Sequence, residues 1–223
     1  MKSALLNLMM FVGLSFSLTS CFDIVDEITV NKDGSGEITI TANLSKSKTK
    51  IASIMLMDSI NGHKVPQKAD IEKILNDAVT YLEKTAGISN ISKKTDFDNY
   101  IFSISCSFTS VENIDNIISE ITKDQKVKPV MVSYAFDGAK KMFSKNYIYT
   151  PEAKKQYDKL KAEDKKVFDE ASYTSIFRFE NEVASVSNNL SKISPSRKAV
   201  MLKTAALELI NGNVSLSNTI QLK

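Results

Sequence analysis

The sequence predicts an α+β domain in which helices pack on one face of an antiparallel sheet. Several short segments alternate apolar and polar residues with the period of a β-strand, and others repeat apolar residues at the spacing of an amphipathic helix. Four Pro and seven Gly in 223 residues give no sign of a long linker, and the chain shows no internal repeat. We therefore expect a single α+β domain over residues 28–223, preceded by a processed N-terminal segment.

Residues 1–20 have the three-part layout of a secretory signal peptide. A lysine supplies the basic start, an apolar stretch covers residues 4–16, and small residues precede Cys21. The apolar stretch is shorter than the roughly 20 residues that a membrane-spanning helix needs. We predict cleavage between Ser20 and Cys21, which leaves residues 21–27 as a lipidated cysteine and a short linker.

The end of this segment, Leu18-Thr19-Ser20-Cys21, resembles the bacterial lipobox. There, a branched apolar residue and two small residues precede a cysteine whose thiol accepts a diacylglyceryl group. The resemblance implies that Cys21 carries lipid, with palmitate among its acyl chains. Two or three chains anchor a protein stably, because each buried CH₂ contributes about 0.8 kcal/mol. The alternative is ordinary secretion with Cys21 as a spare thiol, for which Cys106 is the one other cysteine in the sequence.

Lipid on Cys21 would place the protein in the cell envelope. We expect it to be anchored to a membrane, the outer membrane, with the domain facing the periplasm. A linker of about six residues would span at most about 20 Å, so the domain would stay close to the bilayer. The net charge of +3, with lysines and acidic residues interspersed, gives no reason to expect nucleic acid. The expected partners are the membrane and a lipid or envelope protein.

The first expected element is a β-hairpin. Apolar and polar residues alternate on both sides of the turn Asn31–Gly36, so residues 24–44 should form two paired strands. The turn also imitates the first half of a calcium-binding EF-hand loop. However, Ala42 stands where a bidentate Glu is needed, and both flanks have strand period. We interpret the segment as a turn and predict no metal and no cofactor.

Two helices follow the hairpin. Residues 45–57 have an apolar side that includes Met55 and Met57, for which we favour core packing over an adaptable binding surface. Residues 69–86 form the clearest helix, with apolar residues three and four apart and a glycine at the C-terminal cap. The loop between them carries His63, the single histidine, which cannot build a structural zinc site without other His or Cys ligands.

The next strand covers residues 100–108 and contains Cys106. Aromatic and aliphatic residues share its face with Cys106, and serines fill the other face. We interpret Cys106 as a core residue instead of a reactive nucleophile, because no nearby His or basic residue would activate its thiol. A helix from Val111 to Ile121 follows, with Ser110 as its N-cap.

The second half of the domain is patterned less regularly. Its expected elements are, in order, a hairpin over residues 130–149, a charged helix over 151–171, a strand over 173–180, a further stretch of sheet over 182–188, an ambiguous segment over 198–203 and a last strand over 214–222. The charged helix is expected to present a solvated face, with a partner-binding arm as the alternative. The ambiguous segment is strand or helix, and its β-branched and apolar run favours a strand.

No catalytic motif is present. A Ser-His-Asp arrangement would have to use His63, and the sequence has no nucleophile elbow, phosphate-binding loop, dinucleotide-binding glycines or zinc-protease motif. Paired carboxylates cannot be recognised from sequence, because their pairing is spatial. We therefore assign no catalytic residue. One modification motif, Asp58-Ser59-Ile60, resembles the sequon that some Gram-negative lineages O-glycosylate, which makes Ser59 a candidate glycosylation site.

The start of the mature chain resembles a group of uncharacterised bacterial lipoproteins. In these, a lipid-bearing cysteine leads straight into a hairpin closed by an Asp-Gly-Ser turn, as Cys21 and Asp33–Gly36 do here. The order of elements is similar, more loosely, to the LppM-type lipoprotein domain, and that resemblance implies a lipid or glycolipid ligand. We favour a periplasm-facing binding or structural module for an apolar ligand or protein partner. The alternative is an envelope enzyme with an unrecognised carboxylate-based active site.

Overall fold

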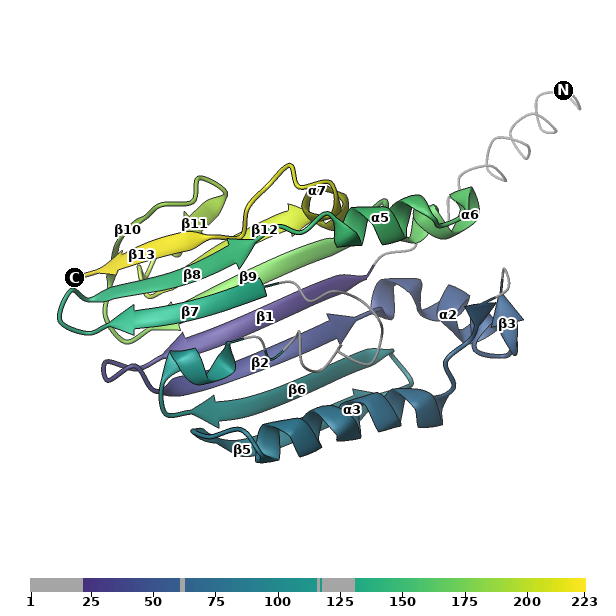
Figure 1. The fold of residues 1–223 in the computed structure, drawn as a ribbon, viewed down its shortest axis with the longest axis horizontal. Coiled ribbons are helices and arrows are strands. Elements are labelled where there is room, and N and C mark those ends of the chain that lie inside the picture. Colours follow the sequence, from purple (N-terminus) through teal and green to yellow (C-terminus); the bar gives the residue numbers. More distant parts are fainter. Residues whose placement is uncertain (1–21, 61–62, 116, 118–130) are drawn as a thin grey trace, which may run out of the picture.

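The computed structural model describes residues 22–60, 63–115, 117 and 131–223 (Figure 1). Ser20 and Cys21, the predicted cleavage and lipidation residues, lie outside the described residues. The described chain forms a seven-stranded sheet, a four-stranded sheet and a small two-stranded sheet, with helices in the connections.

The elements of the first half are β1 (Asp23–Val30), β2 (Gly36–Asn43), the 3₁₀ helix η1 (Ser45–Ser47), α2 (Lys48–Ile54), β3 (Ser59–Ile60), β4 (His63–Lys64), α3 (Lys68–Glu83), β5 (Ile88–Asp96), β6 (Ile101–Phe108) and the 3₁₀ helix η2 (Val111–Ile114). Those of the second half are β7 (Met131–Asp137), β8 (Met142–Ile148), α5 (Glu152–Asp158), α6 (Ala162–Lys165), the 3₁₀ helix η4 (Lys166–Phe168), β9 (Ser172–Phe179), β10 (Val183–Val186), β11 (Ser191–Ile193), β12 (Ala199–Ala205), α7 (Ala206–Ile210) and β13 (Asn218–Leu222).

The seven-stranded sheet is built around β1. Its strand order is β11-β12-β9-β1-β2-β6-β5, so the first strand of the domain is also the central one. β1 pairs antiparallel with β2 and parallel with β9, which aligns Asp26 with Ser175 and Ile28 with Phe177. The sheet is therefore mixed. The predicted antiparallel pairing is present everywhere else in this sheet, and β1 with β9 is its one parallel pair, because β9 returns to β1 only after the intervening half of the chain has crossed over.

One face of this sheet is covered by the four-stranded sheet, whose order is β10-β13-β8-β7, together with α3 (Figure 1). A single core cluster joins Ile28 of β1 and Phe177 of β9 to Phe143 of β8, and also includes Ala78 and Leu82 of α3. Stacked sheets bury their apolar faces in this way because each alone would expose one. Strands and a helix thus share the covered face, in place of the helices expected there.

Most predicted elements form where the sequence patterns put them. The hairpin over β1 and β2, the helix α3, the strand β6, the hairpin over β7 and β8 and the strand β9 are confirmed, and residues 199–205 form a strand, as favoured. Other elements differ: the short strands β3, β4 and β11 were not predicted. β5 was missed because it is an edge strand with mostly exposed, polar residues, including two lysines, which such edges use against unwanted pairing. α7 was missed, and the helix expected over 151–171 is broken into three short pieces.

Element boundaries also differ from expectation: the last strand begins at Asn218 instead of residue 214, and the helix expected over 45–57 is η1 followed by α2, which ends at Ile54. Residues 23–27, which we had assigned to the linker, are part of β1, because Asp23 already pairs with Asn43 and Ser172 on either side. The helix expected from Val111 to Ile121 is described mainly in its first turn, a 3₁₀ helix, since residues 118–130 lie outside the described part. Within the described residues, the helices are too short or too polar to span a bilayer.

Candidate functional site

The strand β1 carries two aspartates whose side chains point in opposite directions. Asp23 and Asp26 are three residues apart, and successive side chains of a strand alternate between its faces. Asp26 is buried between the two sheets, and Asp23 lies at the rim of a cavity on the other face. Each carboxylate binds a lysine. We treat these two ion pairs and their surroundings as the candidate sites.

The buried site, which we call the inter-sheet cluster, consists of Asp26, Lys145, Tyr173 and Ser175. The Lys145 ammonium lies 2.9 Å from a carboxylate oxygen of Asp26, and it donates to the hydroxyls of Tyr173 at 2.8 Å and Ser175 at 2.7 Å. Ser175 in turn donates to the second oxygen of Asp26 at 2.6 Å. All three ammonium donors therefore have an acceptor, which a buried lysine requires.

Aromatic rings close the inter-sheet cluster from several sides. The Lys145 ammonium lies 5.2 Å from the ring centre of Tyr173 and 5.7 Å from those of Tyr134 and Phe177, within cation–π range. The side chains of Lys145 and Asp26 are 0% and 2% exposed. Since Lys145 belongs to β8 and its partners belong to β1 and β9, the cluster ties one sheet to the other.

Burial and charge act against each other on the ionisable groups of this cluster. Burial alone would lower the pKa of Lys145, but the Asp26 carboxylate and the neighbouring phenols outweigh it and raise that pKa above its usual value. Burial, followed by the charge of Asp26, raises the pKa of Tyr173 well above its usual range. Lysine and tyrosine thus keep their protons at neutral pH. These groups are shielded from solvent, and their contacts connect the two sheets.

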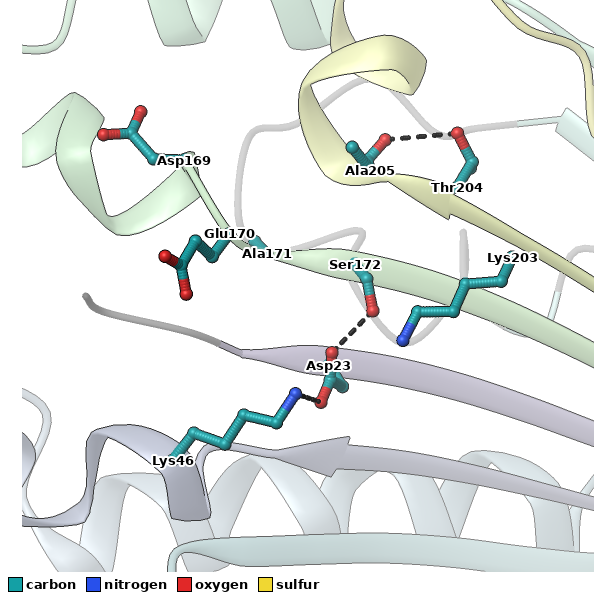
Figure 2. A pocket seen from close by; sticks show the side chains of 9 residues that line it. All are labelled: Asp23, Lys46, Asp169, Glu170, Ala171, Ser172, Lys203, Thr204 and Ala205. Atoms are coloured by element: carbon teal, nitrogen blue, oxygen red, sulfur yellow. Dashed lines mark hydrogen bonds and ion pairs between the residues drawn. The ribbon is translucent and has the colours of Figure 1, made fainter.

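The second site is a cavity of about 310 Å³ beside the start of β1 (Figure 2). Its wall includes Asp23, Lys46 of η1, Lys203 of β12 and the segment before β9 that carries Asp169 and Glu170. Figure 2 shows the Lys203 ammonium directed towards Asp23. Three carboxylates and two lysines therefore line one partly open space, although Figure 2 shows the Asp169 carboxylate directed away from Asp23.

Asp23 is the best-held group of this cavity. Its carboxylate accepts a hydrogen bond from Ser172 at 2.5 Å and lies 3.0 Å from the Lys46 ammonium. Partial burial would raise the pKa of Asp23, but the Ser172 hydrogen bond and the charges of Lys46 and Lys203 together lower it. Asp23 is therefore ionised at neutral pH, suited to binding a cation or fixing a lysine and unsuited to donating a proton.

The chain is fixed to the domain from Phe22 onward. The Phe22 carbonyl accepts a hydrogen bond from the backbone N–H of Ser172 at 3.0 Å. Its ring packs edge-on against Phe168 at 5.6 Å between centroids, and Phe168 packs in the same way against Tyr157 at 5.4 Å. The segment between β8 and β9 was expected to present a solvated face. It also packs against the start of the described chain through Phe168.

The residues singled out in the sequence occupy separate places. Cys106 is buried in β6, where burial raises the pKa of its thiol to about 11, so its interpretation as a core residue is confirmed. Asp33 accepts hydrogen bonds from the backbone N–H and hydroxyl of Ser35, which is the behaviour of a turn. Ser59 is exposed in β3, far in sequence from either site, and its glycosylation stays a prediction.

The sequence contains a signal for the inter-sheet cluster in the phase of two charged residues. Asp26 is in phase with Ile28 and Val30, and Lys145 is in phase with Phe143, so both charges occupy inward-facing strand positions. Two opposite charges on buried faces of different strands predict a pair. Their contact, 119 residues apart in sequence, required the tertiary fold.

Comparisons with known proteins identify no family. No family model matches the chain, and no curated protein matches it significantly. Among solved structures, the fold is similar to the NMR structure of the folded domain of LppM from Mycobacterium tuberculosis, with 13% sequence identity and a TM-score of 0.43, over 91% of this chain and 89% of that one. The chain is thus loosely similar to the domain that its element order resembled.

Proposed function

We propose that this protein is a lipid-anchored envelope protein whose domain serves as a structural or binding module held directly against the membrane. The observation that carries the proposal is the attachment of Phe22. Phe22 immediately follows Cys21, is bound to the domain by its carbonyl and its ring, and leads into the central strand of the large sheet. Consecutive Cα atoms are 3.8 Å apart, so a lipid on Cys21 would be joined to the sheet without a flexible linker.

Such an attachment suits a module that works at a fixed height above the bilayer, in our proposal the outer membrane and its periplasmic side. A protein that had to reach a distant partner would instead need a long flexible linker. The inter-sheet cluster supports the same role, because it uses its charged groups to fix the two sheets together. The partner is then an envelope protein or lipid within reach of the surface.

Metabolic labelling with an alkyne analogue of palmitate tests the anchor. We expect label on the wild-type chain, loss of label in Cys21→Ser, and unchanged label in the matched control Cys106→Ser. Label that persists in Cys21→Ser, or a wild-type chain without label, would overturn the proposal. A pull-down of the detergent-extracted protein, followed by lipid extraction and protein identification, would then separate the lipid partner from the protein partner.

An envelope enzyme is the second candidate, favoured by the presence of Asp23, Asp169 and Glu170 in the lining of one cavity. Paired carboxylates are a recurring catalytic device. The lowered pKa of Asp23 leaves it the role of a fixed anion, so Asp169 and Glu170 would have to supply acid or base. An activity found for the wild type and lost in both Asp169→Asn and Glu170→Gln, with folding intact, would support this function.

A further inference from the structure

An exposed segment lies at the same end of the domain as Phe22. β2 runs antiparallel to β1 and ends at Asn43, opposite Asp23, so the chain after it leaves the sheet where β1 begins. The ion pair of Lys46 with Asp23 fixes the start of this segment to the first residue of β1. Figure 1 shows α2 and β3 beyond this end of the large sheet, at the end where β1 begins.

The segment combines exposed apolar residues with lysines. Leu56 is 90% exposed and Met57 47% exposed in the turn between α2 and β3, and α2 itself has no buried residue, so the core packing predicted for Met57 is wrong. Lys48 and Lys50 lie in the first turn of α2, one helix length before this turn, and the Lys48 ammonium also donates to the side-chain oxygen of Asn99 at 3.2 Å. Over residues 45–58 the charged residues are three lysines and one aspartate. A lone exposed leucine is ordinary, but an apolar tip next to lysines has the composition of a membrane-interface contact.

We propose that the turn carrying Leu56 and Met57 is a second, non-covalent membrane contact. In this arrangement the two side chains enter the boundary between headgroups and acyl chains, and Lys48 and Lys50 lie against anionic headgroups. The proposal rests on the lipid anchor at Cys21, because the anchor turns a weak contact into an intramolecular one at high effective concentration. The domain is then fixed at two points and cannot rotate freely about the lipid.

Position and charge both favour a membrane over a protein partner. Phe22, which immediately follows Cys21 in the sequence, and the turn lie at one end of the described domain, so a bilayer that held a lipid on Cys21 would be the nearest surface. Anionic lipid attracts a basic segment by about 1 kcal/mol per lysine near the surface. The apolar area is small, as expected for a contact that only has to orient an anchored domain.

A tryptophan reporter tests this contact without relying on acylation in cells. The chain contains no Trp, so Leu56→Trp introduces a single reporter. The protein from residue 21 onward retains the whole core cluster, which extends from Ile28 to Leu222. Its Cys21 thiol can be coupled to maleimide-phosphatidylethanolamine in vesicles that contain phosphatidylglycerol and brominated lipid. Cys106 is 3% exposed and does not compete for coupling.

Met201→Trp is the matched control, since Met201 is 40% exposed on β12, away from the turn. We expect about twofold stronger quenching by brominated lipid at position 56 than at 201, because an interfacial side chain sits roughly 5–10 Å into the headgroup and acyl boundary. The difference should shrink when phosphatidylcholine replaces phosphatidylglycerol. Equal quenching at both positions would overturn the contact, and a difference that ignores lipid charge would overturn the role of the lysines.

A second pair of variants keeps the test independent of the reporter. Leu56→Ser with Met57→Ser should loosen the tethered domain and raise its rotational mobility on the vesicle. Leu190→Ser with Met201→Ser, the same two changes at other exposed positions, should leave the mobility unchanged. In the vesicle experiment the maleimide lipid replaces the natural lipid on Cys21. A wild-type chain that takes up no palmitate label in cells would therefore overturn only the proposed lipid anchor. Equal mobility for both pairs, with the label intact on Cys21, overturns only the membrane contact.

Discussion

Asp23 and Asp26 lie on the same strand and each binds a lysine, but the two ion pairs differ in almost every physical respect. The Asp23–Lys46 pair lies at the rim of a cavity, with side chains 17% and 58% exposed, whereas Asp26 and Lys145 are 2% and 0% exposed. The first pair is solvated and joins neighbouring segments. The second is desolvated and joins two sheets. Both pairs join an aspartate to a lysine, so we expect burial to decide how much each pair contributes to the free energy of unfolding.

The largest expected effect comes from breaking the buried pair. Lys145→Met leaves the Asp26 carboxylate buried without its cation, and we expect a loss of about 3–5 kcal/mol in the free energy of unfolding. Urea denaturation followed by circular dichroism measures it. A loss below about 1 kcal/mol, the range of exposed pairs, would mean that the two sheets do not depend on this ion pair.

Replacing both charges should recover much of that loss. In Asp26→Leu with Lys145→Met no unpaired charge remains, and buried ion pairs exchanged for apolar residues are often neutral or about 1–4 kcal/mol stabilising. We expect the double variant to be more stable than Lys145→Met alone in the same urea experiment. A double variant that is less stable than Lys145→Met would show that the hydroxyls of Tyr173 and Ser175 need the charges as hydrogen-bond partners.

The buried pair should also shift the alkaline limit of stability. The folded pKa of Lys145 is raised, so its contribution is fully present below the unfolded pKa of about 10.4 and is lost as the pH rises through the higher folded value. We expect the stability difference between wild type and Lys145→Met to stay constant from neutral pH to about pH 10. A difference that declines between pH 7 and 9 would contradict a raised pKa.

The smallest effect is expected at the exposed pair. Lys46→Met, the same substitution as at position 145, should cost about 0–1 kcal/mol, because exposed pairs are screened by water and salt. Since the pKa of Asp23 is lowered, this small contribution is present above its unfolded pKa of about 3.9 and is lost as the pH falls through the lower folded value. Thermal unfolding of wild type and Lys46→Met at pH 7 and pH 3 measures the cost of the substitution and its decrease at low pH. A cost equal to that of Lys145→Met would remove the distinction between the pairs.

The candidate sites show why a strand pattern alone is incomplete. Alternation identified β1, β8 and β9 and therefore also the faces of Asp26, Lys145 and Ser175. It could not say that β8 belongs to a second sheet stacked on β1, because period two is the same in every sheet. The edge strand β5 was missed for a related reason, since most of its side chains are exposed and the residues that pack against the core, Ile88 and Ile91, do not alternate with the period of a strand.

The sequence by itself determined the local elements and the predicted chemistry of Cys21, because helix and strand periodicity, turn residues and the lipobox pattern are all encoded within a few neighbouring positions. Only the tertiary structure decided that the first strand is central, that Phe22 is fixed to the domain, and that Lys145 meets Asp26. Those contacts join residues more than a hundred positions apart. They exist because the apolar faces of the two sheets must be buried against each other. Which strands face one another depends on the fold of the whole chain.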